Sequence, residues 1–153
     1  MWVGEAVAGV FSGFVGTHTP RMDDKGRVTL PAKYRDRLVG GVVLVRGQDR
    51  TLYLFTTEGF EQFAHRAINA EVTDSAQRGF QRYMLANTED QRPDAQGRIT
   101  IPPKMREYAE LGKDVVITGA GLRMEVWAAD RWAAYEAEQE AAYAAPDRGL
   151  FGS

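Results

Sequence analysis

Hydrophobic and polar residues follow the same succession of patterns twice along the chain. Arg27–Leu30 and Arg98–Ile101 alternate between polar and apolar residues, which predicts strands with one buried face. A proline follows each strand and predicts the start of a short helix, because a first helical position needs no backbone N–H. Largely apolar runs come next, over Val42–Val45 and Val115–Thr118, and predict buried strands.

Each unit is expected to end with one more strand and an amphipathic helix. The strands are predicted over Leu52–Phe55 and Met124–Trp127. The apolar residues of each helix share one face, as a helical period requires; they are Phe60, Phe63, Ala64 and Ile68 in the first and Trp132, Tyr135 and Tyr143 in the second. Four aromatic residues are interpreted as core rather than as a base-stacking platform: Phe55, Trp127, Trp132 and Tyr135.

A further helix is predicted between the two units, over Asp74–Ala86, with Thr73 or Asp74 as its cap. Its periodicity predicts that apolar residues face inward and arginines outward. The inward set is Phe80, Tyr83 and Met84, and the outward set is Arg78 and Arg82.

The two units are copies of one another. Laying the sequence on itself at an offset of 71 aligns Asp23–Arg35 with Asp94–Arg106, and seven of these thirteen positions are identical. Two copies favour a pseudo-two-fold pair over a solenoid, which usually needs three or more repeats.

Composition excludes several classes of protein, and the distribution of charge along the chain locates its basic segments. The 153 residues are 44% hydrophobic and 26% charged, without cysteine, and no apolar run is longer than Leu38–Val45, which is too short to cross a bilayer. The net charge of −2 argues against a nucleic-acid binder. However, residues 21–37 carry six cations and three acids, and residues 92–106 carry four cations and one acid. The total therefore hides two basic blocks and an acidic C-terminal region.

Turn geometry accounts for most of the repeated motif. Asp23 and Asp94 occupy the first position of a type I turn, and Gly26 and Gly97 the fourth, where a positive φ forms the bulge of a three-residue hairpin loop. Asp is favoured at the first position because its side chain accepts backbone N–H bonds.

Arg27 and Arg98 are not required by a turn or a strand, yet both copies contain them. A carboxylate folded back by the hairpin can hold the flat guanidinium in one orientation. An oriented arginine at a hairpin tip suits guanine O6 and N7 or a phosphate. The alternative is an ion pair that only fastens the hairpin, worth ~0–1 kcal/mol when exposed.

The doubled Asp-x-x-x-Arg motif, followed by hydrophobic-Thr-hydrophobic-Pro and a basic helix, resembles the MraZ family of bacterial regulators over about Phe14 to Ala145. The half-unit is similar to AbrB and MazE swapped-hairpin domains. The resemblance implies a mainly β, α+β fold with flanking helices, in which two half-units form one pseudo-two-fold double-split β-barrel. It also implies a cytoplasmic, nucleoid-associated regulator, a ring-like homo-oligomer that binds G-rich direct repeats in the promoter of its own division and cell-wall gene cluster.

Carried over by residue, the resemblance makes Asp23 and Asp94 the motif aspartates and Arg27 and Arg98 the DNA-reading arginines. Lys25 in the first loop is matched by neutral Gln96 in the second, so the two tips need not contribute equally. Charge and position add further expected phosphate contacts: Arg21, Lys25, Lys33, Arg35, Arg92, Lys104 and Arg106.

The chain is expected to divide into an N-terminal extension (1–13), a first half-unit (14–72), a connecting helix (73–87), a second half-unit (88–145) and a tail (146–153). Relatives usually begin near Phe14, so the extension is predicted to be disordered. The expected partners are double-stranded DNA and further copies of the chain, with no membrane, cofactor, metal or small-molecule substrate.

Two other function classes stay open. One is an oligomeric protein-interaction module that docks through the acidic, aromatic C-terminal helix. The other is an enzyme that uses Asp23 or Asp94 as a general base, although no convergent set of acid, base and nucleophile accompanies either residue.

Overall fold

The computed structural model describes residues 11–68 and 74–146. These residues form a mainly β fold with several helices, of the α+β class expected from the sequence. Most of the predicted extension and tail, and Thr73 as a cap, lie outside the described residues. Within the described part of the chain, no helix has the length and apolar character needed to cross a membrane.

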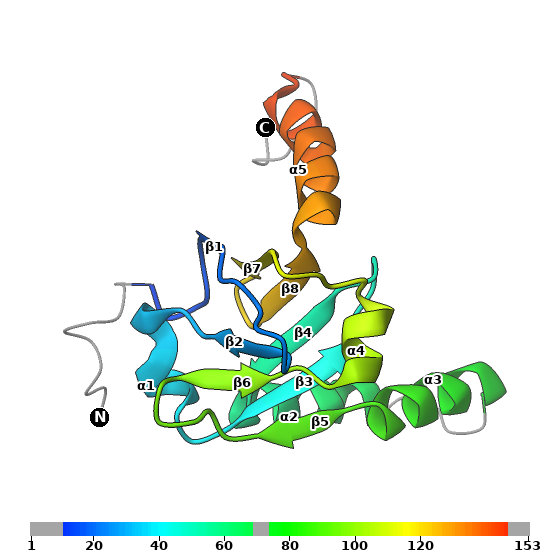
Figure 1. Ribbon diagram of the computed structural model, residues 1–153. Coiled ribbons are helices and arrows are strands. Elements are labelled where there is room, and N and C mark those ends of the chain that lie inside the picture. Colours follow the sequence, from blue (N-terminus) through cyan, green and yellow to red (C-terminus); the bar gives the residue numbers. More distant parts are fainter. Residues whose placement is uncertain (1–10, 69–73, 147–153) are drawn as a thin grey trace.

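The strands form two antiparallel sheets (Figure 1). The larger has six strands in the order β1 (Thr17–His18), β7 (Val115–Gly119), β8 (Met124–Ala128), β4 (Leu52–Thr56), β3 (Val42–Arg46) and β5 (Glu89–Gln91). The smaller is a ribbon of two strands, β2 (Arg27–Thr29) and β6 (Arg98–Thr100). The alternating segments therefore became the ribbon, and the apolar segments became the larger sheet.

The pairing of strands respects the internal repeat. In the ribbon, Val28 lies opposite Ile99, the residue that matches it in the other copy. In the larger sheet, Tyr53 of β4 lies opposite Glu125 of β8, again a matched pair. Each junction between the copies is thus centred on one repeated position, so exchanging the two copies preserves the register of both sheets.

One hydrophobic core joins the copies. Val28 and Leu30 of the first and Ile99 and Ile101 of the second are each 1% exposed and belong to the same buried cluster as Leu44. Val43 and Val45 lie in a second cluster with Phe55 and Met84. Because β3 is buried on both faces, it reads as an unbroken apolar run rather than as an alternation.

Helices surround the sheets. Pro31 and Pro102 precede the short helices after the ribbon strands, namely a 3₁₀ turn (Ala32–Tyr34) that continues into α1 (Arg35–Leu38), and α4 (Pro103–Tyr108). The longer helices are α2 (Thr57–Ile68), α3 (Ser75–Ala86) and α5 (Ala129–Ala144). Asp74 caps α3 as predicted, and its Oδ1 accepts hydrogen bonds from the backbone N–H groups of Ala76 and Gln77 at 2.8 and 3.3 Å.

The predicted inward face of α3 is wrong at two of its three residues. Met84 is buried, but Phe80 and Tyr83 are 59% and 53% exposed. The reason is visible in Figure 1, where α3 runs out beyond the edge of the sheet so that only part of the helix has a surface to pack against. The periodicity of α3 predicts an apolar face, but it does not predict whether other parts of this chain pack against that face.

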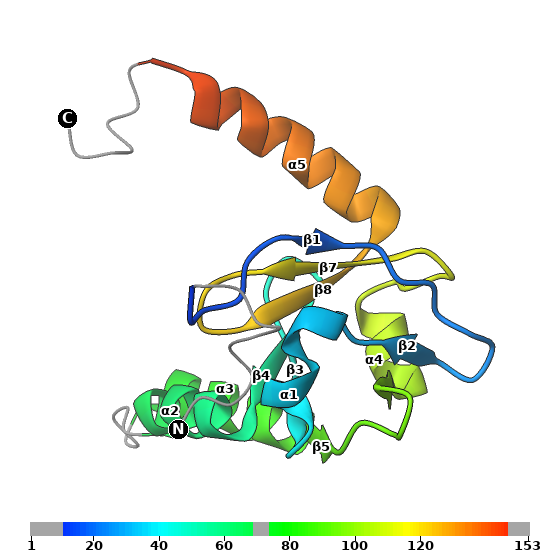
Figure 2. The same cartoon turned by 90° about the vertical axis from the view of Figure 1, so that its left-hand side faces the viewer.

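α5 departs from the expectation in the same way. Trp127 and Phe55 are buried as predicted, whereas Tyr135 is 36% exposed and α5 contains no buried residue. Trp132 and Tyr135 pack on Trp127, with ring centroids 5.2 and 4.9 Å from its own. Beyond this aromatic contact the helix extends away from the body as an arm (Figure 2), and Tyr143 is 64% exposed.

Candidate nucleic-acid interface

The Asp23 carboxylate organises the first turn. Its Oδ1 accepts hydrogen bonds from the backbone N–H groups of Lys25 and Arg27 at 3.0 and 2.8 Å. The backbone N–H of Gly26 donates to the Asp23 carbonyl, and Gly26 has φ +82°. This is the type I turn and glycine bulge that the sequence predicted.

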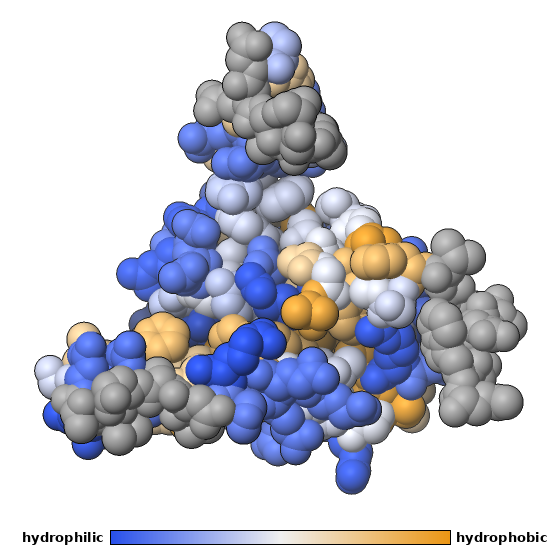
Figure 3. All heavy atoms as spheres, turned by 180° about the vertical axis from the view of Figure 1, so that it is seen from behind, coloured by the Kyte–Doolittle hydropathy of each residue, from blue (hydrophilic) through white to orange (hydrophobic). Residues whose placement is uncertain are grey.

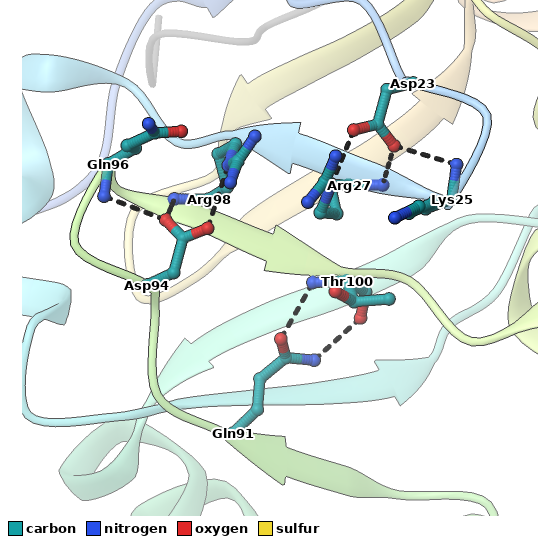
Figure 4. Close-up of polar contacts among 8 residues, drawn as sticks. All are labelled: Asp23, Lys25, Arg27, Gln91, Asp94, Gln96, Arg98 and Thr100. Carbon is teal, nitrogen blue, oxygen red and sulfur yellow. Dashed lines mark hydrogen bonds and ion pairs between the residues drawn. The ribbon is translucent and has the colours of Figure 1, made fainter.

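The same carboxylate holds the arginine that follows the turn. Asp23 Oδ2 accepts a hydrogen bond from Arg27 Nε at 2.6 Å. In the second turn, Asp94 Oδ1 accepts from the backbone of Gln96 and Arg98 at 2.9 and 2.8 Å, and Oδ2 from Arg98 Nε at 2.8 Å. Figure 4 shows the two arrangements on the two strands of the ribbon.

Holding each arginine through Nε leaves the outer end of its guanidinium free. Among the described residues, Asp23 is the hydrogen-bond and ion-pair partner of Arg27, and Asp94 that of Arg98. The Arg27 and Arg98 side chains are 34% and 28% exposed. Their Nη1 and Nη2 groups can therefore donate a pair of parallel hydrogen bonds to an acceptor outside the protein.

The outer face of the ribbon carries both arginines. Val28 and Ile99 point into the core, so the neighbouring positions of each strand, Arg27 and Thr29 on β2 and Arg98 and Thr100 on β6, face outward. Arg27 lies opposite Thr100, and Thr29 opposite Arg98. Sequence reasoning passed over the two threonines, although strand alternation places them on the arginine face.

Each turn is covered by an arginine from the other copy. A β-carbon built on Gly26 would lie 2.8 Å from Nη1 of Arg106, and one built on Gly97 would lie 2.6 Å from Nε of Arg35. Arg35 and Arg106 are matched residues of the repeat, so the packing is reciprocal. These two predicted phosphate contacts therefore also have a structural role that requires glycine at the turn.

The other predicted basic residues differ in their contacts and in their exposure to solvent. Arg21 forms an ion pair of 3.6 Å with Asp114, both about three-quarters exposed. The ammonium of Lys33 lies 5.2 Å from the centre of the Tyr34 ring. The remaining three are exposed: Lys25, Arg92 and Lys104.

The two edges of the ribbon differ. Gln91, which sequence reasoning missed, accepts a hydrogen bond from Thr100 N–H at 2.8 Å and donates one to the Thr100 carbonyl at 2.7 Å (Figure 4). At the same offset, Pro20 stands in the place of Gln91, and Thr29 has no such partner among the described residues. Aligning the two copies pairs Gln91 with Pro20, which has no side-chain amide, so the alignment alone does not reveal this contact.

Both motif carboxylates are anions at neutral pH. The hydrogen bond from Arg27 N–H is the main cause that lowers the pKa of Asp23 below its ordinary 3.8, with the Arg27 guanidinium adding to it against partial desolvation. The Arg98 N–H and guanidinium lower the pKa of Asp94 in the same way. A carboxylate in this state is an acceptor for arginine rather than a poised general base.

The described residues contain no group of three His, Asp or Glu side chains placed to hold a metal ion. His18 lies in β1 and His65 in α2.

Comparison with known proteins gives consistent relatives over most of the chain. The model of the MraZ protein family matches residues 14–83 and 84–152. The transcriptional regulator MraZ of Thermobifida fusca is 50% identical over 131 residues, 86% of this chain and 92% of its own. That of Saccharopolyspora erythraea is 49% identical over the same shares, and that of Salinispora tropica 47% identical over 90% of this chain and 96% of its own.

Proposed function

The chain belongs to the MraZ family, and from that premise we propose that it is a transcriptional regulator that binds double-stranded DNA sequence-specifically through the β2–β6 ribbon. The observation that carries this proposal is the outer face of the ribbon, with two arginines held by carboxylates and open at their Nη ends. The relatives named as transcriptional regulators support the function class rather than an enzyme.

A two-stranded antiparallel ribbon is of a size that enters the major groove of B-DNA. There the end of a guanidinium can donate two hydrogen bonds to O6 and N7 of guanine, the commonest specific contact of arginine. Arg27 and Arg98 are proposed to read guanines in this way, in G-rich direct repeats. Thr29 and Thr100 lie beside them on the same face.

Phosphate contacts position the ribbon on the duplex without reading sequence. We assign this role to the basic residues around the ribbon, namely Arg21, Lys25, Lys33, Arg35, Arg92, Lys104 and Arg106. Lys25 makes the first tip more cationic than the second, which has Gln96 at the matching position.

One ribbon offers few contacts, so the proposal includes several copies of the chain. A ring-like homo-oligomer can engage successive direct repeats at high effective concentration, which raises the overall affinity without any new type of contact. The promoter of its own division and cell-wall gene cluster is the proposed target, and the cytoplasmic nucleoid the place of action. Within each chain of the oligomer, the ribbon and the larger sheet are proposed to close a double-split barrel of the swapped-hairpin type.

Gel-shift titration with a fragment of that promoter tests the proposal. We expect Arg27→Ala or Arg98→Ala to weaken binding roughly 5- to 150-fold, since one bidentate base contact is worth ~1–3 kcal/mol. Their melting temperatures should stay near that of the unaltered chain, because an ion pair that is still open to solvent on one side adds only ~0–1 kcal/mol.

Arg82→Ala is the matched control, since it removes the same charge from exposed α3. Binding should also weaken with salt, with a slope of about −0.9 per neutralised phosphate on a logarithmic plot. Binding that is independent of salt, or equal in the Arg82 and Arg27 variants, would refute DNA reading by the ribbon.

A second candidate function is a protein-interaction module built on α5. The observation that favours it is an arm of 16 residues without a buried residue, with Tyr143 64% exposed. Its described acidic residues are Asp130, Glu136, Glu138 and Glu140. Mass measured by light scattering, for the full chain and for Tyr143→Ser, tests whether this helix joins copies of the chain.

A further inference from the structure

A cavity of about 420 Å³ lies away from the ribbon, on the face of the larger sheet that α2 and α3 cover. Strands β3 and β4, both helices, and Tyr108 of α4 contribute to its wall. The residues that matter most are Arg46, Tyr53, Phe80, Tyr83, Tyr108 and Arg123. Seen from behind in Figure 3, apolar surface near the α2–α3 corner is set among hydrophilic residues.

Arginines and aromatic rings alternate around this cavity. The guanidinium of Arg46 lies 5.7 Å from the Tyr83 ring and 5.3 Å from the Tyr108 ring, and its Nη1 donates to the Tyr83 hydroxyl at 2.8 Å. The guanidinium of Arg123 lies 3.9 Å from the Tyr53 ring. These contacts fix both cations in place before any ligand arrives.

The cations retain donors that nothing accepts. The Nε atoms of Arg46 and Arg123 are buried and have no hydrogen-bond partner among the described residues. Arg123 pairs with Glu125 through Nη2, but no described lining residue of the cavity is acidic. The cavity therefore carries excess positive charge at its wall, which favours an anion.

The mouth of the cavity is apolar and open. Phe80 and Tyr83, the two α3 residues that failed to pack inward, stand at its edge at 59% and 53% exposure. The repeat does not produce the same site twice, because Gly119 and Glu125 of the second copy occupy the positions of Arg46 and Tyr53. The cavity is thus lined by residues of both units and of the connecting helix, and the repeat alone does not produce it.

We propose that this cavity binds a small organic anion, with an aromatic or hydrocarbon body against Tyr53, Phe63 and Phe80 and a carboxylate, sulfonate or phosphate group at Arg46 and Arg123. The volume lies within the 300–1,000 Å³ usual for ligand pockets. Apolar walls with a few fixed polar groups are the usual composition of such pockets. The site is separate from the DNA-reading ribbon, so it stands whether or not the ribbon binds DNA.

Two fluorescent probes test the proposal on the full chain. 8-Anilinonaphthalene-1-sulfonate has the proposed body and one anionic group, and N-phenyl-1-naphthylamine has the same body without the charge. We expect the sulfonate to bind saturably at one site per chain. Arg46→Gln and Arg123→Gln should each weaken it at least tenfold and change the affinity of the neutral probe less than twofold.

Controls separate the cavity from general binding of the probe. Arg82→Gln, on the α3 helix but outside the cavity lining, should bind the sulfonate like the unaltered chain. Phe80→Ala should weaken both probes; its side chain is largely exposed, so this variant keeps the test usable if an arginine variant fails to fold. Equal sulfonate affinity in the Arg46, Arg123 and unaltered chains overturns the proposal, as does sulfonate binding that vanishes when chains associate at higher concentration.

Discussion

Replacing the turn glycines by alanine measures how tightly the reciprocal arginine packing constrains the ribbon. Gly26, Gly97 and Gly121 have φ of +82°, +77° and +81°, so alanine experiences nearly the same backbone strain at each. Left-handed backbone costs a non-glycine residue ~1–2 kcal/mol. The three positions differ in what a new β-carbon meets.

At Gly121 no atom lies within 4 Å, so strain alone should act. At Gly97 the three nearest atoms all belong to the flexible Arg35 side chain, which can move aside. At Gly26 the β-carbon would also lie 2.9 Å from the Ile101 carbonyl oxygen, a backbone atom held by the ribbon. Overpacking against a fixed neighbour adds ~1–3 kcal/mol.

We therefore expect Gly121→Ala to lower the free energy of unfolding by ~1–2 kcal/mol, and Gly26→Ala to lower it by ~2–5 kcal/mol. Gly97→Ala should fall between them. A loss of ~3 kcal/mol corresponds to a fall of roughly 6–12 °C in melting temperature for a chain of this size. Urea titration followed by circular dichroism measures all three. Equal losses for Gly26→Ala and Gly121→Ala would refute the claim that the turn is confined by the opposite copy.

Three further outcomes follow from the same structure. Gly79→Ala, in the interior of α3 with no atom within 4 Å of the new β-carbon, should raise the free energy of unfolding by roughly 0.5–1 kcal/mol in urea. Asp23→Asn and Asp94→Asn should keep the turns but release the arginine Nε atoms, so DNA affinity should fall while the chain stays folded at the temperature of the assay; unchanged affinity would show that the carboxylates do not orient the arginines. Because both pKa values lie below 3.8 in the folded chain, the carboxylates contribute full stability above that pH and lose it as the pH falls through the lower folded value. The stability difference between the unaltered chain and the double Asn variant should thus be constant from about pH 5 to 8 and shrink below about pH 4; a difference that varies at neutral pH would contradict this assignment.

The sequence predicted those parts of the fold that depend on short-range chemistry. The turn at Asp23 required an aspartate and a glycine at fixed spacing, and both bonds and φ agree with that expectation. The cap at Asp74 and the strand predicted over Val42–Val45, observed as Val42–Arg46, followed from equally local signals. The repeat also indicated two matched units, and the register of both sheets respects it.

What the sequence could not supply depends on contacts between distant residues. Periodicity placed Phe80 and Tyr83 on an apolar stripe, but only the path of α3 decides whether this chain covers them. Charge alone suggested that Arg35 faces a phosphate, whereas its packing on Gly97 depends on the other copy lying alongside. The cavity at Arg46 was missed because its partner Tyr83 is far away in sequence. Gln91 was missed because no pattern of residue types marks its pairing with Thr100.

The reciprocal packing of an arginine of each repeat on the turn of the other makes the two repeats depend on one another. Arg35 packs against the turn of the second copy and Arg106 against that of the first. Neither half therefore contains all the residues that support its own turn. A duplicated unit is usually free to diverge in one copy while the other keeps the original task. Here a substitution of Arg35 or Arg106 in one half changes the packing of the turn in the other half. Cutting the chain between the halves would remove the arginine that packs on each turn.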